Sequence, residues 1–448
     1  MPKTCIIGAG LSGLALAWQK KRTGESCTVL EAGSRVGGAI RSQRQADYVA
    51  EEGPHSILIN NAAIEAFLES IPGLTEQIIE ARPQAKKRFI VRKGQLQPAP
   101  SSPWAALSSP LLSLAGKLRL LKEPFIGSAP KDSEESVANF ARRRFGPELY
   151  HYAINPMVGG IYAGDPEQLS LRHAFPKLHT LDQQPAGIIC GGLKQLRAAR
   201  RAQPNQQVRK RIISFKNGMA ELPNRLAAAL APQIQCNISI QSIQRKSSGW
   251  HLSWHSDQGL QTSYFDQLIL TTPAHRLARL PFEQEILAAM AALQQIEYPP
   301  VSVISLSFKR ADVAHPLDGF GALVPECENR KILGVLFPSS IFNGRAPSDE
   351  VLLSVFVGGA RQPSLAKPKT SMVLGNVLAE LEALLGITAA PTSIHHKHWP
   401  QAIPQYKLDH GQHLAHILDI ERRFPGLQLA GNYRTGISVS DCIKAALV

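Results

Sequence analysis

The stretch that decides the fold is residues 4–41, TCIIGAGLSGLALAWQKKRTGESCTVLEAGSRVGGAIR. A short apolar run at 5–7 ends at the glycine-rich turn GAGLSG, and a helical apolar pattern then leads to a second apolar run at 27–30. A strand, a tight turn, a helix and a strand in this order, with the G-x-G-x-x-G spacing at the turn, are typical of a dinucleotide-binding unit. A structural glycine-rich turn in an unrelated α/β unit is the alternative.

The glycines of this turn have separate predicted roles. Gly8 allows the tight turn, Gly10 lets backbone N–H groups approach a pyrophosphate, and Gly13 lets the helix pack close to the strand. The N terminus of the helix offers unpaired donors and partial positive charge to the phosphates. Glu31 lies about 20 residues further on, where its carboxylate can accept hydrogen bonds from both ribose hydroxyls and would repel a 2′-phosphate. The residues predicted to contact the dinucleotide here are Gly8, Gly10, Leu11, Ser12, Gly13, Glu31 and Ala32.

The continuation of this unit favours FAD over NAD. Gly37 and Gly38, in the segment SRVGG at 34–38, keep the chain close to the phosphates. Arg41 follows them and is predicted to pair with a phosphate, a role that suits a guanidinium group.

Two further glycine-rich turns are predicted to lie beside the flavin. The first, EEGPHS at 51–56, is fixed by its Gly-Pro pair, and an ordinary solvated loop is the alternative. The second, at 431–443, runs into a helix whose N terminus at 438–440 would stabilise negative charge on a reduced flavin. A plain capped helix is the alternative there. The predicted flavin contacts in these turns are Gly53, Pro54, His55, Gly431, Gly436, Ser438 and Val439.

Composition limits the class of protein. The chain has 448 residues with 44% hydrophobic content, which is enough for two or three domains with large cores. The excess of 49 Lys and Arg over 35 Asp and Glu suits an anionic partner: a membrane surface, a polycarboxylate ligand or nucleic acid. The six cysteines have no metal-ligand spacing, which favours reduced thiols in a cytosol-facing protein without a metal site.

The first strand begins so close to Met1 that no signal peptide is expected. No apolar run reaches ~18 residues, so any membrane contact is expected to be peripheral or monotopic.

The order of the helical and strand-like segments along the chain predicts a mixed α/β (α+β) fold in three parts. Residues 1–80, 205–295 and 416–448 are predicted to form a Rossmann-like FAD-binding domain, into which an antiparallel-sheet substrate domain of residues 81–103 and 296–415 is inserted. Residues 104–204 are predicted to be a helical domain with membrane contact, because the apolar stretch at 101–130 carries basic residues and fits monotopic insertion. An ordinary domain interface explains that stretch equally well.

Three segments of the helical part carry further expectations. Residues 134–152 are interpreted as a helix with Arg142, Arg143 and Arg144 on its surface. The Gly- and Pro-rich segment at 155–166 is interpreted as a loop. The basic run at 194–211 is interpreted as a solvated or lipid-headgroup-facing loop, because it lacks the interleaved aromatic residues of a nucleic-acid surface.

Taken together, segments spread along the whole chain resemble the oxygen-dependent protoporphyrinogen oxidases of the amine-oxidase superfamily. The segments are GAGLSGL, EEGPHSI, KRFIV, NPMVGGIYAGDPEQLSLRHAFP, GFGALVP, ILGVLF, FVGGAR, HWPQAIPQY and LAGNYRTGISVSDCI. The resemblance implies FAD-dependent oxidation of protoporphyrinogen IX to protoporphyrin IX, with O₂ as acceptor and H₂O₂ as product, in haem biosynthesis. It also implies a membrane-seated helical domain, and therefore a cytoplasmic protein or one on the cytoplasmic face of the inner membrane. The sequence leaves a homodimer open.

The resemblance also implies a substrate site. It places Arg88 opposite a substrate propionate, Leu323 and Leu336 on either side of a pyrrole ring, and Phe356 in a stack on another ring. Gly159 and Gly160 would lie beside the macrocycle, and Ile240 would offer its backbone to adenine. No catalytic acid–base pair is predicted. Ala39, where many relatives carry arginine, and the basic run near Arg200 depart from the family pattern.

Three other functions compete with this one. Coproporphyrinogen III, a tetracarboxylic substrate of the same family, suits the high positive charge, although Arg88 within KRF resembles the protoporphyrinogen type. An amine-type flavin oxidase is a more distant enzyme alternative. A flavin-bound protein without turnover, whether structural or nucleic-acid-binding, is the non-enzymatic one, and the prediction here is that nucleic acid is not a partner.

Overall fold

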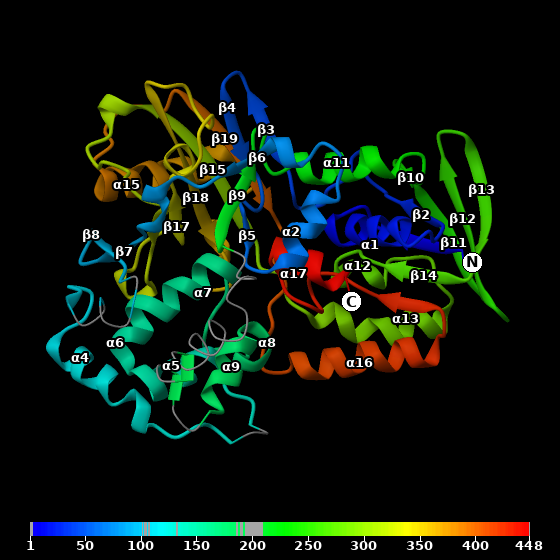
Figure 1. Ribbon diagram of the computed structural model, residues 1–448, viewed down its shortest axis with the longest axis horizontal. Helices are drawn as coiled ribbons and strands as arrows, with labels where there is room; N and C mark the ends of the chain where they lie inside the picture. The colour runs from blue at the N-terminus through cyan, green and yellow to red at the C-terminus, as the bar shows by residue number, and fades with distance from the viewer. Residues whose placement is uncertain are drawn as a thin grey trace.

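The computed structural model describes residues 3–100, 102, 105, 108–130, 133–184, 187–188, 191–192 and 209–447. Its central element is a five-stranded sheet, seen on the right in Figure 1, in which every neighbouring pair is parallel. The strand order is β10 (Ile234–Gln235), β2 (Cys27–Leu30), β1 (Thr4–Ile7), β14 (Gln267–Leu270) and β20 (Leu427–Leu429). Segments far apart in the sequence therefore complete the unit that begins at Thr4.

The side chains of this sheet alternate between two hydrophobic cores. Ile6 and Val29 belong to one core, which is shared with α1 (Leu11–Arg22), α2 (Ala62–Glu69), α11 (Glu221–Leu230) and α17 (Val439–Ala445). Cys5 and Ile7 belong to the other. That second core is shared with β11 (Ser239–Lys246), β12 (Gly249–Ser256), β13 (Gly259–Phe265), α12 (Ala274–Leu277), α13 (Gln284–Met290) and α16 (His410–Arg423). A parallel sheet covered on both faces in this way buries both sets of alternating side chains.

A seven-stranded sheet lies at the upper left of Figure 1. Its order is β19 (Ser393–Trp399), β15 (Val301–Lys309), β18 (Glu350–Gly358), β17 (Gly334–Leu336), β16 (Gly321–Leu323), β7 (Phe89–Arg92) and β8 (Gln95–Pro98). The antiparallel sheet predicted from the sequence is present, but one pair, β16 with β7, is parallel. Helix α15 (Leu374–Leu385) packs on one face of the sheet, where Val335, Val355 and Leu381 share a core.

The remaining strands form two small sheets. One is the hairpin of β3 (Ser42–Gln45) and β4 (Tyr48–Glu51), and the other has the order β5 (Ile57–Ile59), β9 (Arg211–Phe215), β6 (Ile78–Glu80). The short helix α14 (Pro338–Ile341) follows β17.

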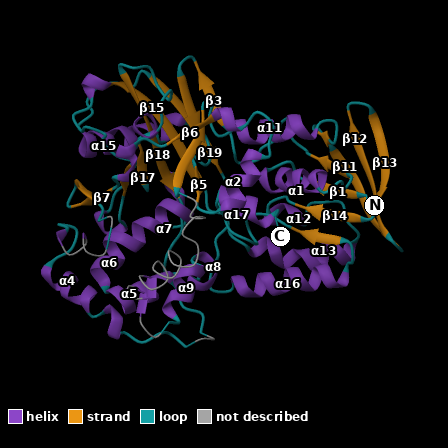
Figure 2. Ribbon diagram, viewed as in Figure 1, coloured by secondary structure: helices purple, strands orange, loops and turns teal. Residues whose placement is uncertain are grey.

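Helices fill the lower left of the molecule (Figure 2). They are α4 (Leu114–Leu121), α5 (Val137–Phe145), α6 (Pro147–Leu149), α7 (Asn155–Tyr162), α8 (Leu171–Ala174) and α9 (Pro176–Asp182). None of the helices in the described part of the chain is long and apolar enough to cross a membrane. Trp104, Leu107, Cys190 and most of the basic run at 194–211 lie outside the described residues.

Two expectations for this helical region were wrong. Arg144 was expected on the surface, but it is 1% exposed and its Nε pairs with the carboxylate of Asp182. The segment at 155–166 was expected to be a loop, but most of it forms α7. Pro156 lies near the start of α7, which directly continues the π-helical turn Tyr150–Ile154. The mixed α/β class predicted from the sequence is confirmed.

Candidate functional site

The turn between β1 and α1 has the shape of a phosphate cradle. Gly8 has φ of 107°, and a Cβ on Gly13 would lie 2.0 Å from the Gly8 carbonyl oxygen, so both positions require glycine. Gly10 precedes α1 without any side-chain cap, and the nearest atom to a Cβ there would be Gly38 Cα at 4.0 Å. The N terminus of α1 therefore lies beside the open position at Gly10, an arrangement that fits the pyrophosphate of a dinucleotide.

Glu31 closes one end of this cradle. One of its carboxylate oxygens accepts the N–H of Ala9 at 2.7 Å, and the other accepts the N–H of Gly33 at 2.8 Å. Each oxygen keeps lone-pair capacity for a ribose hydroxyl. The Glu31 carbonyl accepts the N–H of Ile238, which places the segment leading to Ile240 next to Glu31 and Ala32.

The loop with Gly37 and Gly38 lies directly against the turn. The Gly37 N–H donates to the Ala9 carbonyl at 2.8 Å, and both glycines have positive φ, 99° and 57°. Arg35 holds this loop, because its guanidinium donates to the carbonyls of Val36 and Gly38, each at 3.0 Å. The sequence analysis missed this role of Arg35. The available signal was the position of an arginine inside a glycine-rich loop, because the backbone carbonyls of such a loop need hydrogen-bond donors.

Arg41 is engaged by a carboxylate in this structure. Its Nε lies 3.1 Å from Glu52, which is 3% exposed and also lies 3.0 Å from His395 and 3.8 Å from Lys397. The indole of Trp399 donates to the Glu52 carbonyl at 2.7 Å. Glu52 thus ties strand β19 to the nucleotide-binding side, a role that the sequence analysis missed because these residues are more than 300 positions apart. The contact of Arg41 with a phosphate stays a prediction.

The turn at Gly53 brings the two sides of the molecule together. A Cβ on Gly53 would lie 2.1 Å from the Ala39 carbonyl oxygen, so this close approach requires glycine. After Pro54, His55 is 8% exposed, and its Nδ1 lies 3.1 Å from the Gly53 carbonyl oxygen. Burial lowers the pKa of His55 to about 4, which keeps the ring neutral at neutral pH. The ring contacts Phe356 edge-on, with 5.5 Å between centroids.

The second predicted turn also ends beside α1. Gly431 and Gly436 have φ of 140° and 124°, and α17 begins after Ser438, whose hydroxyl caps it by accepting the Asp441 N–H at 3.1 Å. Val439 shares a core with Leu11, and Ser12 interacts with Cys442 of α17. The predicted turn and helix are confirmed; their contact with a flavin stays a prediction.

The predicted substrate residues lie on one face of the seven-stranded sheet. Leu323 and Phe356 both pair with Gly334, and Leu336 pairs with Gly321. Because directly paired residues point to the same side of a sheet, all three large side chains share the face opposite α15. Gly321 and Gly334 allow a close approach of backbone, because a Cβ would lie 2.3 Å from the Val335 carbonyl oxygen and 2.6 Å from the Ala322 carbonyl oxygen, respectively. This surface, Leu323, Leu336 and Phe356 with the two glycines between them, is called the substrate face below.

Helix α7 covers one end of the substrate face. A Cβ on Gly160 would lie 2.5 Å from Leu323 Cδ2, so a larger residue there would require the Leu323 side chain to move. A Cβ on Gly159 would lie 3.0 Å from Nη2 of Arg361. The structure thus brings Gly159, Gly160 and Leu323 together, as predicted, but in a helix rather than in a loop.

Arg88 immediately precedes β7, the strand next to β16. It is exposed, its guanidinium lies 5.2 Å from the Phe320 ring centroid, and it forms no ion pair with any carboxylate of the described residues. Its neighbours differ, because Lys87 pairs with Asp318 at 2.7 Å and Arg92 pairs with Glu148 at 2.8 Å. Arg88 is therefore free to bind an anion.

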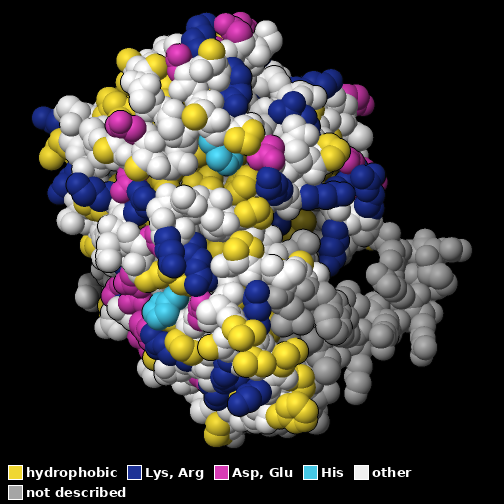
Figure 3. Space-filling model, turned by 90° about the vertical axis from the view of Figure 1, so that its left-hand side faces the viewer, with side chains coloured by type: hydrophobic (Ala, Val, Ile, Leu, Met, Phe, Trp, Pro, Cys, Tyr) yellow, Lys and Arg dark blue, Asp and Glu magenta, His cyan; other side chains and the backbone are white. Residues whose placement is uncertain are grey.

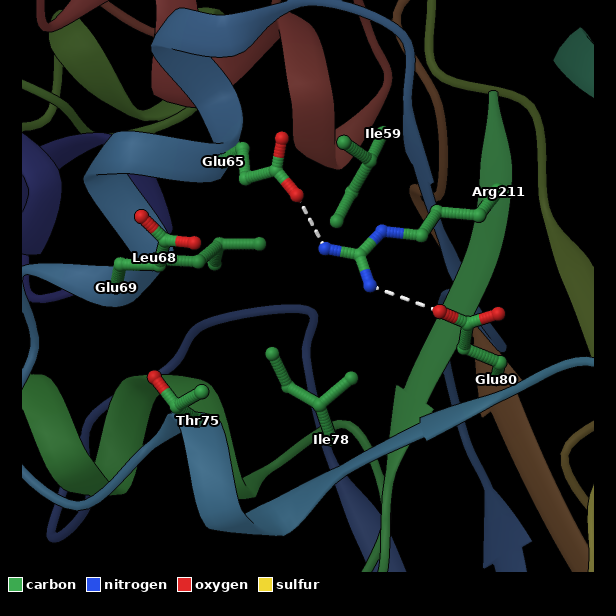
Figure 4. A pocket seen from close by; sticks show the side chains of 8 residues that line it. All are labelled: Ile59, Glu65, Leu68, Glu69, Thr75, Ile78, Glu80 and Arg211. Atoms are coloured by element: carbon green, nitrogen blue, oxygen red, sulfur yellow. Dashed lines mark hydrogen bonds and ion pairs between the residues drawn. The ribbon is translucent and has the colours of Figure 1, made fainter. Parts of the chain in front are cut away.

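A separate pocket of about 260 Å³ lies between α2 and the small sheet of β5, β9 and β6. Figure 4 shows that Arg211 reaches into it and is held by Glu65 and Glu80. The pocket contains none of the predicted site residues. Arg211, the last residue of the basic run, is thus already neutralised by two carboxylates.

Comparisons with known proteins agree with this geometry. A family model described as flavin containing amine oxidoreductase matches residues 11–447. The chain is 33% identical to protoporphyrinogen oxidase 2, chloroplastic/mitochondrial, of Arabidopsis thaliana, over 99% of this chain and 92% of that protein. It is 25% identical to coproporphyrinogen III oxidase of Bacillus subtilis (strain 168), over 99% and 96% of the two chains. The crystal structure of a provisionally named protoporphyrinogen oxidase from Exiguobacterium sp. 255-15 superposes with a TM-score of 0.81 at 24% identity, covering 99% and 97%, and shows that the fold is shared.

Proposed function

Because this chain belongs to the flavin containing amine oxidoreductase family, we propose that it is an FAD-dependent enzyme that oxidises protoporphyrinogen IX to protoporphyrin IX with O₂ as the acceptor. One observation carries the proposal. The substrate face meets the nucleotide-binding side at the contact of Phe356 with His55. At its far end stands Arg88, which has no ion-pair partner among the described residues. A broad apolar wall with few polar groups suits a macrocycle.

Bound FAD supplies the acceptor for hydride equivalents, and the residues of the chain bind and orient the substrate. Arg88 holds a propionate with a charge-assisted hydrogen bond. Leu323, Leu336 and Phe356 pack on the rings. Six hydrogens leave the porphyrinogen in three two-electron steps, and three O₂ are reduced to three H₂O₂. His55 stays neutral, so it places no positive charge against the apolar wall.

The charges around the substrate face favour protoporphyrinogen over coproporphyrinogen. Coproporphyrinogen III carries four carboxylates and needs several cations. Among the described residues, Lys397 already pairs with Glu52, and Arg361 with Glu326, which leaves Arg88 as the unpaired cation at the face. A substrate with fewer carboxylates fits this arrangement better, because each unpaired carboxylate in a partly desolvated site is costly.

We also propose that the helical region rests on an anionic membrane surface at the cytoplasmic face of the inner membrane. Leu114, Leu118 and Leu121 of α4, with Phe125 just after it, are 73%, 54%, 55% and 88% exposed. The spacing of the three leucines places them on one side of α4 in a stripe, and Phe125 follows this stripe in the next turn of the chain. Lys117 and Lys122 lie in the same segment, and Figure 3 shows hydrophobic side chains among Lys and Arg side chains on the lower part of this face. An exposed apolar stripe with basic neighbours suits an interfacial helix.

Vesicle flotation tests the membrane contact. The variant L118S/L121S/F125S should lose binding to vesicles containing phosphatidylglycerol while keeping its flavin. Leu260→Ser removes a leucine that is 62% exposed on β13 and should bind like the unchanged protein. Equal binding by the stripe variant would exclude this surface as the membrane contact.

Turnover tests the reaction. The purified yellow protein is mixed in air with protoporphyrinogen IX or coproporphyrinogen III, and porphyrin fluorescence and peroxide are followed together. We expect faster turnover of protoporphyrinogen IX, with three peroxides per porphyrin. Preference for coproporphyrinogen III would assign the alternative substrate, and oxidation of amines without any porphyrin formation would contradict the proposal.

A further inference from the structure

Tyr406, the last residue of the segment HWPQAIPQY, connects to the turn that enters α17. Its hydroxyl donates to the carbonyl of Asn432 and accepts the N–H of Gly436 at 2.9 Å. The side chain is buried, with 3% exposure. A single hydroxyl thus bridges two backbone groups four residues apart in the turn, where Gly436 has a φ of 124°.

The ring of Tyr406 is itself held from the other side. It stacks on His410 of α16 with 4.1 Å between centroids and 15° between planes. It also meets Tyr162 of α7 edge-on at 5.9 Å. The Tyr406 carbonyl accepts the N–H of Ser170 at 2.8 Å. Because the ring and the backbone are both fixed, the position of the hydroxyl is fixed as well.

The turn that Tyr406 bridges is close to the dinucleotide cradle. Helix α17, which follows the turn, packs on α1, and Ser12 in the first turn of α1 interacts with Cys442. Gly436, Ser438 and Val439 are the residues predicted to approach the flavin there. A shift of this turn would therefore change the environment of the flavin without touching the cradle itself.

We propose that Tyr406 is a positioning residue for the flavin: its hydroxyl fixes the turn at 432–436 and thereby the approach of the α17 N terminus to the cofactor. The inference rests on the FAD-binding part of the proposed function and not on the identity of the substrate. The buried ring of Tyr406 connects this turn to α7, the helix that covers one end of the substrate face.

Tyr406→Phe is the test, because it keeps the stacked ring and removes only the hydroxyl. The N–H of Gly436 then has no partner among the described residues, and the carbonyl of Asn432 loses its donor. We expect the dissociation constant of FAD to rise about tenfold, which corresponds to about 1.4 kcal/mol. We also expect a shift of the visible flavin absorption, while the far-UV circular dichroism of the apoprotein stays unchanged.

Tyr433→Phe is the matched control. Tyr433 lies in the same turn and is fully buried, but its hydroxyl has no hydrogen-bond partner among the described residues. Its removal should leave the FAD dissociation constant within about twofold of the unchanged protein, well below the tenfold step of 1.4 kcal/mol. If Tyr406→Phe also stays within twofold and its flavin spectrum is unchanged, Tyr406 has only a structural role and the proposal is overturned.

Amide hydrogen exchange gives a second measurement that needs no variant. In the unchanged protein, FAD should slow exchange in peptides covering 432–438 more than in peptides of α9, which lies in the helical region. Equal exchange at 432–438 with and without FAD would overturn the proposal even if Tyr406→Phe fails to fold. Neither measurement uses a porphyrinogen, so a wrong substrate assignment would leave both results intact.

Discussion

The two walls of the candidate site are encoded in different ways. The nucleotide-binding side is built largely from residues 8–41, where the spacing of glycines and one carboxylate already specifies the geometry. The substrate face takes its residues from β16, β17 and β18, and Arg88 precedes β7 at residue 89, so strand pairing across more than 200 residues brings them together. A local pattern can be derived from physical chemistry alone, whereas a face assembled by pairing depends on the whole fold.

This difference predicts that the first wall is sensitive to single glycines. Gly10→Val should abolish FAD binding, because its side chain fills the open space between Gly10 and Gly38, while the apoprotein still folds. The measurement is flavin content after purification, with circular dichroism of the apoprotein.

Gly13→Val provides the contrast. Its Cβ would lie 2.0 Å from the Gly8 carbonyl oxygen, so the packing of α1 on β1 is lost along with the cofactor. A folded Gly10→Val protein that keeps its flavin would show that the cradle does not hold the pyrophosphate.

His55 lies where the two walls meet, and its titration tests that contact. Burial lowers the pKa of His55 in the folded protein to about 4, below its ordinary value of 6.5. As the pH falls from about 6.5 to about 4, the unfolded chain binds a proton that the folded protein does not, so stability is lost by up to about 3 kcal/mol. His55→Phe should reduce this loss, as measured by urea unfolding at pH 7, 5.5 and 4.5.

His255→Phe, at an exposed histidine of β12, is the control and should leave the pH profile of stability unchanged. Identical profiles for His55→Phe and the unchanged protein would mean that His55 is not buried against Phe356 in solution.

The sequence analysis was most complete where the signal was local. The strand, turn and helix of the cradle, the turn before α17 and the antiparallel sheet were all predicted from spacing and periodicity. It was wrong for Arg144, because no local pattern reveals the partner Asp182 that allows an arginine to be buried. It did not find Arg35 or Glu52, because their partners are backbone carbonyls or side chains of a distant strand. The substrate residues came only from the resemblance.

Arg88 tests whether the second wall binds an anion. Arg88→Ala should raise KM about 10- to 100-fold, since a hydrogen bond to a charged group contributes about 1.5–3 kcal/mol. The flavin content should not change, because Arg88 lies on the sheet and not on the cradle. Steady-state kinetics with protoporphyrinogen IX, together with the flavin absorbance, measure both.

Lys87→Ala is the neighbouring control. Lys87 and its partner Asp318 are both exposed, so this pair contributes little and KM should change by less than about threefold. Unchanged KM and turnover in Arg88→Ala would remove Arg88 from the site and leave the substrate face without its predicted anchor.

Substitution of Arg41 should have the smallest effect on FAD affinity. Arg41 lies in the segment that builds the nucleotide-binding side, but its side chain already pairs with Glu52. Its side chain is 40% exposed, and an exposed charge contributes about 0.2–1 kcal/mol. Arg41→Ala should therefore raise the FAD dissociation constant about threefold at low salt, and the effect should shrink at 0.5 M salt because exposed charges are screened. Titration of the apoprotein with FAD at both salt concentrations measures this. If Arg41→Ala instead weakens FAD binding tenfold or more at both salt concentrations, Arg41 leaves Glu52 and binds a phosphate directly. FAD binding would then depend on an arginine that, in this structure, is paired with Glu52, the residue that also contacts strand β19.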